Sequence, residues 1–136
     1  MEISKIPFNE FISIKESEDK QTLGLNFRQE LQNHLQTMHA SAQFSLAEAC
    51  SGLVLLQAFP ELADTVVPVL RKAEIKFKSP AAADIYGKAT ISDEEKEKFL
   101  STLTKKSRAI INVSVQIFAN DTLTMIGSFE WFVQKM

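Results

Sequence analysis

The chain has 136 residues, of which 45% are hydrophobic and 24% are charged, and its formal net charge is −2 at pH 7. These values are typical of one compact globular domain, which we expect to span residues 1–136. The negative charge argues against a nucleic-acid partner, which would need a large basic surface. A single cysteine excludes an internal disulfide framework. Together with only two histidines, it leaves few ligands for a structural zinc site.

Targeting and cofactor motifs are missing from the sequence as well. The first residues lack the apolar core and the small-residue cleavage site of a secretory signal. The longest apolar stretch, around residues 53–59, is too short to span a bilayer. No glycine-rich phosphate loop is present, which disfavours a nucleotide cofactor. The sequence therefore predicts a cytoplasmic protein without a cofactor, a metal or a membrane partner.

The first thirty residues are predicted to form a β-hairpin. Strands at residues 11–16 and 22–28 flank a polar turn at residues 17–20. Within the second strand, apolar side chains alternate with period two, as in a half-buried strand. A short loop over residues 32–38 follows the hairpin.

Residues 39–59 are predicted to form one long helix that ends at Pro60. The segment is apolar around most of its circumference, as expected for a helix buried on nearly all sides. At about 100° per residue, one narrow stripe about 60° wide contains a group of small and polar residues: Ser41, Ser45, Glu48 and Gly52. Glu48 is the only carboxylate of the helix. A buried carboxylate must be paired, hydrogen-bonded or protonated, which makes Glu48 the most informative residue of the chain.

Two strands and a surface helix are predicted next. Strands at residues 66–79 and 82–91 are separated at Ser79-Pro80. Residues 93–106 are typical of an exposed amphipathic helix, with acids in its first turn and lysines in its last. Ser92 and Glu95 form a capping-box pattern at its start.

Alternating apolar residues over 109–117 and 123–133 predict a final hairpin that turns at Asn120-Asp121. The element order is strands, one buried helix and further strands. This order predicts an α+β fold in which an antiparallel sheet curls around a long central helix, with an extra surface helix late in the chain.

Around the start of the long helix, Asn33 precedes His39 by six positions, Ala40-Ser41 follows directly, and Glu48 comes nine positions after His39. This pattern, after a hairpin and at the start of an apolar helix, resembles the hotdog-fold acyl-CoA thioesterases, above all the phenylacetate-pathway type and related thioesterase domains. Residues 72–81, KAEIKFKSPA, are similar to the strand that follows the helix in that family. The resemblance covers residues 11–133 and implies hydrolysis of an acyl-CoA or acyl-carrier thioester.

Thioester hydrolysis needs a carboxylate and hydrogen-bond donors aimed at the developing oxyanion. Glu48 is the candidate base or nucleophile; the alternative is a buried glutamate satisfied by Ser45 or by a neighbouring strand. The N–H of Ala40 is the candidate oxyanion donor, although every helix has free N–H groups at its start. Asn33 and His39 are candidates for positioning water or the thioester, and each has a purely structural alternative in the loop or the helix start.

Four further residues are candidates for substrate binding. Ser41 and Ser45 lie on the stripe of Glu48, and Phe44 is a candidate for an apolar tunnel that holds the acyl chain, although most aromatic residues of a buried helix are core. Lys72 belongs to a set of basic residues that could meet the phosphates of coenzyme A, although edge lysines are usually solvated. Cys50 is interpreted as a small core residue rather than a nucleophile.

The sequence also departs from the family. Ala40-Ser41 stands where the family often has Gly-Gly, Gln36 replaces a common loop glycine, and Glu48 stands where many relatives carry aspartate. Leu70 lies about where one branch carries a hydroxyl residue that positions water. These departures keep open a non-catalytic acyl-CoA-binding module as the alternative.

The resemblance further implies a homodimer or a dimer of dimers. Asn33 and His39 of one subunit would then face Glu48 of the other subunit. A hotdog hydratase or dehydratase ranks lower as an alternative, because the histidine-phenylalanine-proline loop of that branch is absent.

Overall fold

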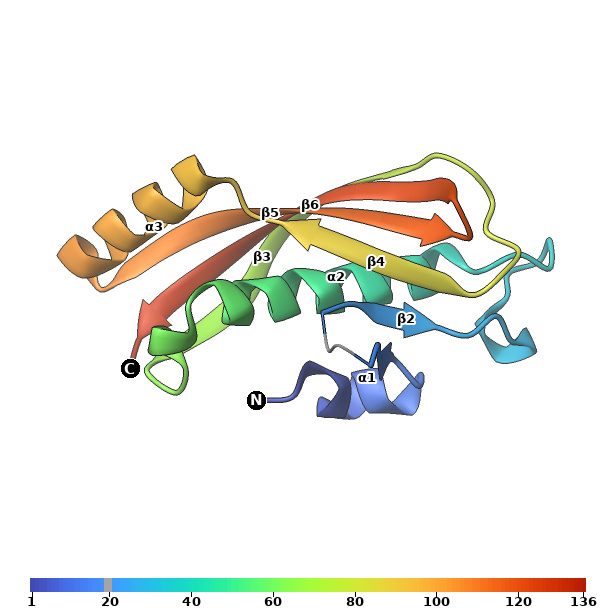
Figure 1. The fold of residues 1–136 in the computed structure, drawn as a ribbon, viewed down its shortest axis with the longest axis horizontal. Coiled ribbons are helices and arrows are strands. Elements are labelled where there is room, and N and C mark those ends of the chain that lie inside the picture. Colours follow the sequence, from blue (N-terminus) through green and yellow to red (C-terminus); the bar gives the residue numbers. More distant parts are fainter. Residues whose placement is uncertain (19–20) are drawn as a thin grey trace.

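A computed structural model of the chain describes residues 1–18 and 21–136. Within these ranges, six antiparallel strands form one sheet in the order β1-β2-β4-β5-β6-β3, and the long helix α2 lies against one of its faces (Figure 1). The predicted α+β architecture, a sheet around a central helix, is confirmed. The strands are β1 (Lys15–Glu16), β2 (Leu23–Leu25), β3 (Val66–Phe77), β4 (Ile85–Thr90), β5 (Arg108–Ala119) and β6 (Thr122–Lys135). The helices are α1 (Pro7–Phe11), α2 (Ala40–Ala58) and α3 (Asp93–Lys106), and the short 3-10 helices are η1 (Ile3–Lys5), η2 (Gln29–Leu31) and η3 (Pro60–Leu62).

Helix α2 is covered on two opposite sides. The sheet covers one side, mainly through β4 and β5, and the N-terminal segment with η1 and α1 lies on the other (Figure 1). On the sheet side, Cys50 Sγ fills the space that a side chain at Gly87 of β4 would occupy. On the opposite side, the side chain of Ile3 lies 3.5 Å from the position that a Cβ of Gly52 would take. The sequence prediction of a helix buried on nearly all sides is therefore confirmed.

The C-terminal hairpin supplies much of the core beneath α2. Strands β5 and β6 pair along their whole length, with an irregularity between Ile117 and Phe118. Every second residue of β5 is buried, as the alternation predicts. The buried apolar residues of the two strands are Ala109, Ile111, Val113, Val115, Ile117, Ala119, Met125, Phe129 and Val133.

Helix α3 forms where the sequence predicts it and covers a free strand edge. Strand β4 ends at Thr90, so the first half of β5 has no partner strand on that side. Ser92 Oγ accepts a hydrogen bond from the N–H of Glu95, which is half of the predicted capping box. The carboxylate of Glu95 accepts instead from the N–H of Asn112, at 3.1 Å. The helix thus satisfies a backbone donor that an unpaired edge would leave free.

The predicted N-terminal hairpin is only partly correct. Residues 15–16 and 23–25 pair as antiparallel strands, but the predicted strand at residues 11–14 does not form. Pro7 starts α1, because its fixed φ suits the first turn of a helix. Ser13 then takes a left-handed φ of 66°, and the N–H of Ile14 turns back to bond the carbonyl of Asn9. The predicted turn at residues 17–20 lies partly outside the described residues.

Two further strands are shorter than predicted. Strand β3 ends at Phe77 rather than at residue 79, and β4 covers residues 85–90 rather than 82–91. The N–H groups of Lys78 and Ser79 both point to the carbonyl of Thr124. Two donors that share one acceptor cannot continue a regular ladder, so the strand ends there.

The contact between α2 and β4 predicts the effect of a methyl group at Gly87. A Cβ at this position would overlap Cys50 Sγ and would lie 3.0 Å from Ile117 Cδ1, inside van der Waals contact. We expect Gly87→Ala to lower the free energy of unfolding in urea by about 1–3 kcal/mol. In a Cys50→Ala background the same substitution should cost clearly less, because the nearest atom is gone. Equal costs in the two backgrounds would contradict this packing argument.

Candidate active site

Glu48 lies on the side of α2 that faces β6, between two contacts of the helix with aromatic residues of that strand. One turn before it, the ring of Phe44 packs against the ring of Phe129, with centroids 5.6 Å apart. One turn after it, Ser51 Oγ accepts a hydrogen bond from Trp131 Nε1 at 2.9 Å. Since Phe129 and Trp131 are neighbours on the same face of β6, Glu48 is held above the stretch between them.

The carboxylate of Glu48 is half-buried and makes no hydrogen bond or ion pair with any residue that the structure describes. Burial without a compensating partner raises its pKa above the ordinary value of 4.5. The alternative of a glutamate satisfied by Ser45 is not what the geometry shows, because Ser45 Oγ donates to the carbonyl of Ser41 at 2.8 Å. Glu48 is thus a partly desolvated carboxylate, which is the condition of a general base.

The predicted stripe opens toward solvent at the start of the helix. Ser41 is exposed, Ser45 and Glu48 are half-buried, and Gly52 is buried under Ile3 and Trp131. In the first half of α2, the residues that stay exposed or half-buried therefore gather on this side of the helix. Within one chain, the structure brings Glu48, Ser41, Ser45 and Phe44 together on adjoining parts of one helix.

The start of α2 offers a free donor. The N–H of Ala40 is exposed and donates to no described residue, as the first N–H groups of a helix have no partner within it. His39 is the N-cap residue, and its Nδ1 accepts from the N–H of Ser41 at 2.9 Å. The ring of His39 therefore holds the helix start, which is the structural alternative stated for it, while its other nitrogen remains exposed.

Asn33 organises the loop before α2. Its Oδ1 accepts from the N–H groups of Leu35 and Thr37, at 2.9 and 3.1 Å, and its Nδ2 donates to Thr37 Oγ1 at 2.9 Å. Both ends of the amide are thus used within the loop, as in an Asx turn. A role in positioning substrate remains a prediction, and it would require Nδ2 to share its second hydrogen.

The same loop explains one departure from the family pattern. Gln36, at the position where a glycine is common, has a left-handed φ of 58°. Glycine adopts this region without steric cost, whereas a residue with a Cβ is strained by about 1 kcal/mol. Gln36 therefore adopts the left-handed region in spite of its side chain.

Lys72 does not join this group. It pairs in register with Glu130, a neighbour of the inward-facing Phe129, so it lies on the sheet face opposite α2. Its Nζ forms an exposed ion pair with Glu74 at 3.3 Å. Binding of a substrate phosphate by Lys72 stays a prediction that no contact within one chain supports.

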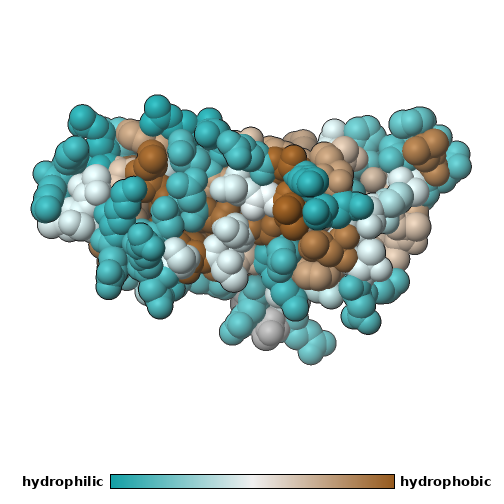
Figure 2. Space-filling model, turned by 90° about the horizontal axis from the view of Figure 1, so that it is seen from above, coloured by the Kyte–Doolittle hydropathy of each residue, from teal (hydrophilic) through white to brown (hydrophobic). Residues whose placement is uncertain are grey.

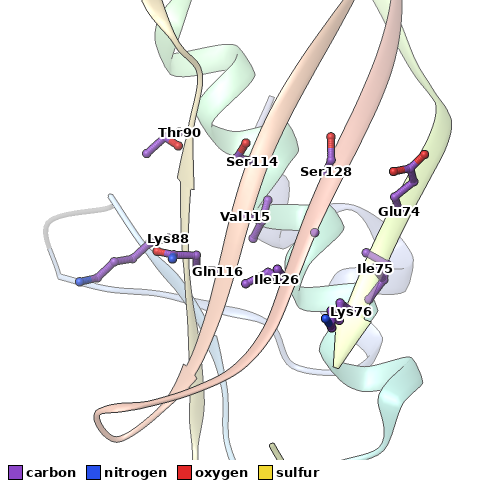
Figure 3. Close-up of a pocket in the computed structure, with 11 residues that line it drawn as sticks. Glu74, Ile75, Lys76, Lys88, Thr90, Ser114, Val115, Gln116, Ile126 and Ser128 are labelled. Atoms are coloured by element: carbon purple, nitrogen blue, oxygen red, sulfur yellow. The ribbon is translucent and has the colours of Figure 1, made fainter. Parts of the chain in front are cut away.

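The outer face of the sheet carries a shallow hollow of its own (Figure 3). Three hydroxyl residues line it in one row across β4, β5 and β6, namely Thr90, Ser114 and Ser128. Lys76 and Lys88 lie at its two sides, and polar and apolar residues are interspersed over the face seen from above (Figure 2). None of the predicted site residues lines this hollow, and the sheet separates it from Glu48.

The sequence did not reveal the polar contacts that join α2 to the sheet. Gln43 is only 4% exposed, and its Oε1 accepts from Thr124 Oγ1 at 2.8 Å. Ser51 is fully buried and accepts from Trp131. Polar residues on an apolar helix are a signal for such contacts, but partners about 80 residues away in sequence cannot be assigned from spacing.

Among residues 1–18 and 21–136, no group of three or more histidine, cysteine, aspartate or glutamate residues could hold a metal ion. No helix in these ranges is long and apolar enough to cross a membrane. Cys50 is buried, and burial raises the pKa of its thiol to about 12, so it is unsuited to act as a nucleophile.

With this geometry in view, the chain was compared with known proteins. It belongs to the family described as domain of unknown function DUF4442, whose model matches residues 11–133. The search of curated proteins gives no match.

Solved structures show the fold class. A protein of Pseudomonas aeruginosa described as a probable thioesterase superposes with a TM-score of 0.82 at 18% identity, over 98% of this chain and 91% of the other. A Haemophilus influenzae thioesterase gives 0.76 at 12% identity, over 98% and 86%. A Bacillus halodurans protein solved with CoA gives 0.72 at 16%, over 93% and 74%. The fold is the hotdog fold, as the resemblance implied.

The raised pKa of Glu48 predicts a pH-dependent loss of stability. The folded chain binds this proton more tightly than the unfolded chain, so folding stability falls as pH rises from 4.5 through the raised pKa. We expect Glu48→Gln to unfold at higher urea than wild type at pH 7. The gain should stay below about 1 kcal/mol, because the carboxylate is partly solvated, and it should vanish below pH 4.5. Glu97→Gln, an exposed change on α3, controls for net charge; a gain from Glu48→Gln that is independent of pH would contradict the assignment.

Proposed function

We propose that the protein hydrolyses an acyl thioester, with acyl-CoA or an acyl-carrier conjugate as substrate. The observation that supports this most is the half-buried carboxylate of Glu48, which no described residue pairs, on a helix whose first N–H, that of Ala40, donates to no described residue. Such a carboxylate can take a proton from water, and the free N–H of Ala40 can donate to an oxyanion.

The proposed reaction proceeds in two steps. Glu48 removes a proton from a water molecule as the water oxygen attacks the thioester carbonyl, and the resulting oxyanion accepts a hydrogen bond from Ala40 N–H. The tetrahedral intermediate then collapses, the carbon–sulfur bond breaks, and the leaving thiolate takes the proton from Glu48. The products are a carboxylic acid and a free thiol. No cofactor or metal is needed for either step.

Helix geometry favours a site shared by two copies of the chain. Ala40 and Glu48 are eight residues apart, which is about 12 Å along a helix at 1.5 Å per residue. A glutamate side chain cannot span this distance to the same carbonyl carbon. In the proposed homodimer, Ala40 of one protomer, with Asn33 and His39, therefore faces Glu48 of the other.

The proposed dimer interface runs along the edge strand β3. It is twelve residues long and pairs on one side only, with β6. Its inward-facing residues Ala73, Ile75 and Phe77 are not covered by α2, and Phe77 is 48% exposed. A second copy would satisfy this backbone edge and cover these side chains beside Glu48. A dimer of dimers would add a further contact elsewhere.

The comparisons support the same activity. Two of the similar structures are described as thioesterases, and a third was solved with CoA. The engaged amide of Asn33 favours the alternative of a non-catalytic acyl-CoA-binding module, because it leaves less polar machinery free. Turnover separates the two functions: the enzyme releases thiol, whereas the binding module holds acyl-CoA without consuming it.

The first test is thiol release from short, medium, long and aromatic acyl-CoAs. We expect wild type to release thiol and Glu48→Gln to be at least about a hundredfold slower, because the amide cannot accept the proton of water. Glu97→Gln, the charge-matched surface control, should keep the wild-type rate. Binding of acyl-CoA without thiol release would support the binding module, and full activity of Glu48→Gln would contradict the proposed mechanism.

A shared site predicts complementation between two inactive variants. Asn33→Asp keeps the acceptor that holds the loop but removes the amide donor. If Asn33 and Glu48 meet across the dimer, a heterodimer of Asn33→Asp and Glu48→Gln has one intact site and one doubly altered site. An equal mixture after subunit exchange should regain about a quarter of wild-type activity, because half of the dimers carry one working site of two. A mixture no more active than its components would contradict the shared site.

A further inference from the structure

The fully buried Ser51 and the tryptophan of β6 form a directional hydrogen-bond chain that ends at Glu48. An indole N–H can only donate, so Trp131 Nε1 donates to Ser51 Oγ, at 2.9 Å. The hydroxyl hydrogen of Ser51 is then free, and it donates to the backbone carbonyl of Glu48 at 2.7 Å. The chain thus connects the sheet to the helical turn that carries the candidate base, without contact to its carboxylate.

The surrounding packing restricts this turn further. Gly52 has no side chain, and its Cβ position lies 3.7 Å from the ring of Trp131 and 3.5 Å from Ile3. The turn after Glu48 is therefore clamped between β6 and the N-terminal segment. On the other side of Glu48, the ring of Phe44 packs against Phe129 of the same strand.

We propose that Ser51 and Trp131 are positioning residues, which fix the backbone of Glu48 so that its carboxylate meets the water and the thioester held by the second protomer. This inference rests on the proposed function, since it concerns the same reaction. A base displaced by about 1 Å loses much of its efficiency, because proton transfer requires a narrow range of distances. Substrate binding does not depend on that alignment, so loss of the chain should act on kcat and not on KM.

Matched variants can separate this role from general stabilisation. Ser51→Ala and Trp131→Phe each remove one link while keeping most of the volume. Thr65→Ala and Tyr86→Phe are the controls. Thr65 Oγ1 donates to the carbonyl three residues earlier at 2.8 Å, as Ser51 does, and Tyr86 Oη donates to the carbonyl of Asn120 at 2.9 Å. Both controls are exposed hydrogen bonds, and neither involves a residue of α2.

We expect Ser51→Ala and Trp131→Phe each to lower kcat about three- to tenfold with KM within about twofold of wild type. The double variant should be no slower than the slower single variant, because either change breaks the same chain. The two controls should keep the wild-type kcat. Wild-type kcat in both single variants, or multiplicative losses in the double variant, would overturn the proposal. If Ser51→Ala does not fold, Trp131→Phe alone still tests whether kcat falls while KM stays near the wild-type value.

An experiment that requires no enzymatic turnover tests this inference separately from the proposed function. Trp131 is the single tryptophan of the chain, so its indole N–H resonance is unambiguous in NMR. We expect slow hydrogen exchange at this N–H in wild type and fast exchange in Ser51→Ala. Fast exchange in wild type would overturn the inference whether or not the protein is an enzyme. Absence of thiol release from wild type, with slow exchange retained, would instead contradict the proposed function, while the hydrogen-bond chain that fixes the backbone of Glu48 would stand.

Discussion

The structure depends on the need to cover a helix that is apolar around most of its circumference. Helix α2 cannot lie on a surface with one side to water, because exposure of any apolar side costs free energy in proportion to its area. The sheet covers one side through β2, β4, β5 and β6, and the N-terminal segment covers the opposite side. In the first half of the helix, Ser41 stays exposed and Ser45 and Glu48 stay half-buried, so the coverage of the helix decides where its one carboxylate meets solvent.

The same arrangement explains why Glu48 is chemically special without any charged neighbour. Desolvation raises the pKa of Glu48. On one side of it, Phe44 packs against Phe129, and on the other side Ser51 accepts a hydrogen bond from Trp131. A paired carboxylate would be more stable but a poorer base, because an ion pair or hydrogen bond lowers its pKa. The folded chain therefore bears a small loss of stability at the residue that the proposed hydrolysis needs.

The strand order matters for the same site. Strand β3 lies at the edge of the sheet next to β6, the strand that Phe44 and Ser51 of α2 contact on either side of Glu48. One chain therefore offers a carboxylate, a free helix N-terminus about 12 Å from it, and an unpaired edge. These are the parts from which a site between two copies can be built, and a single copy cannot bring the carboxylate and the donor to one carbonyl carbon.

Periodicity and capping residues in the sequence were enough to predict α2, α3 and the β5–β6 hairpin, because long apolar patterns and caps are local properties. Periodicity also placed Glu48 in a stripe of small residues, whereas the spacing of Asn33, His39 and Glu48 became informative only through the resemblance to hotdog-fold thioesterases. The predicted N-terminal strand was wrong over residues 11–14, since Pro7 and the turn at Ser13 override a weak alternation. Only the tertiary structure decided what surrounds the stripe: which sides of α2 are covered, that Lys72 faces away, and that Trp131 reaches Ser51 across 80 residues of sequence. Such contacts depend on how the sheet and helix pack, and no local pattern encodes the position of a partner so distant in the chain.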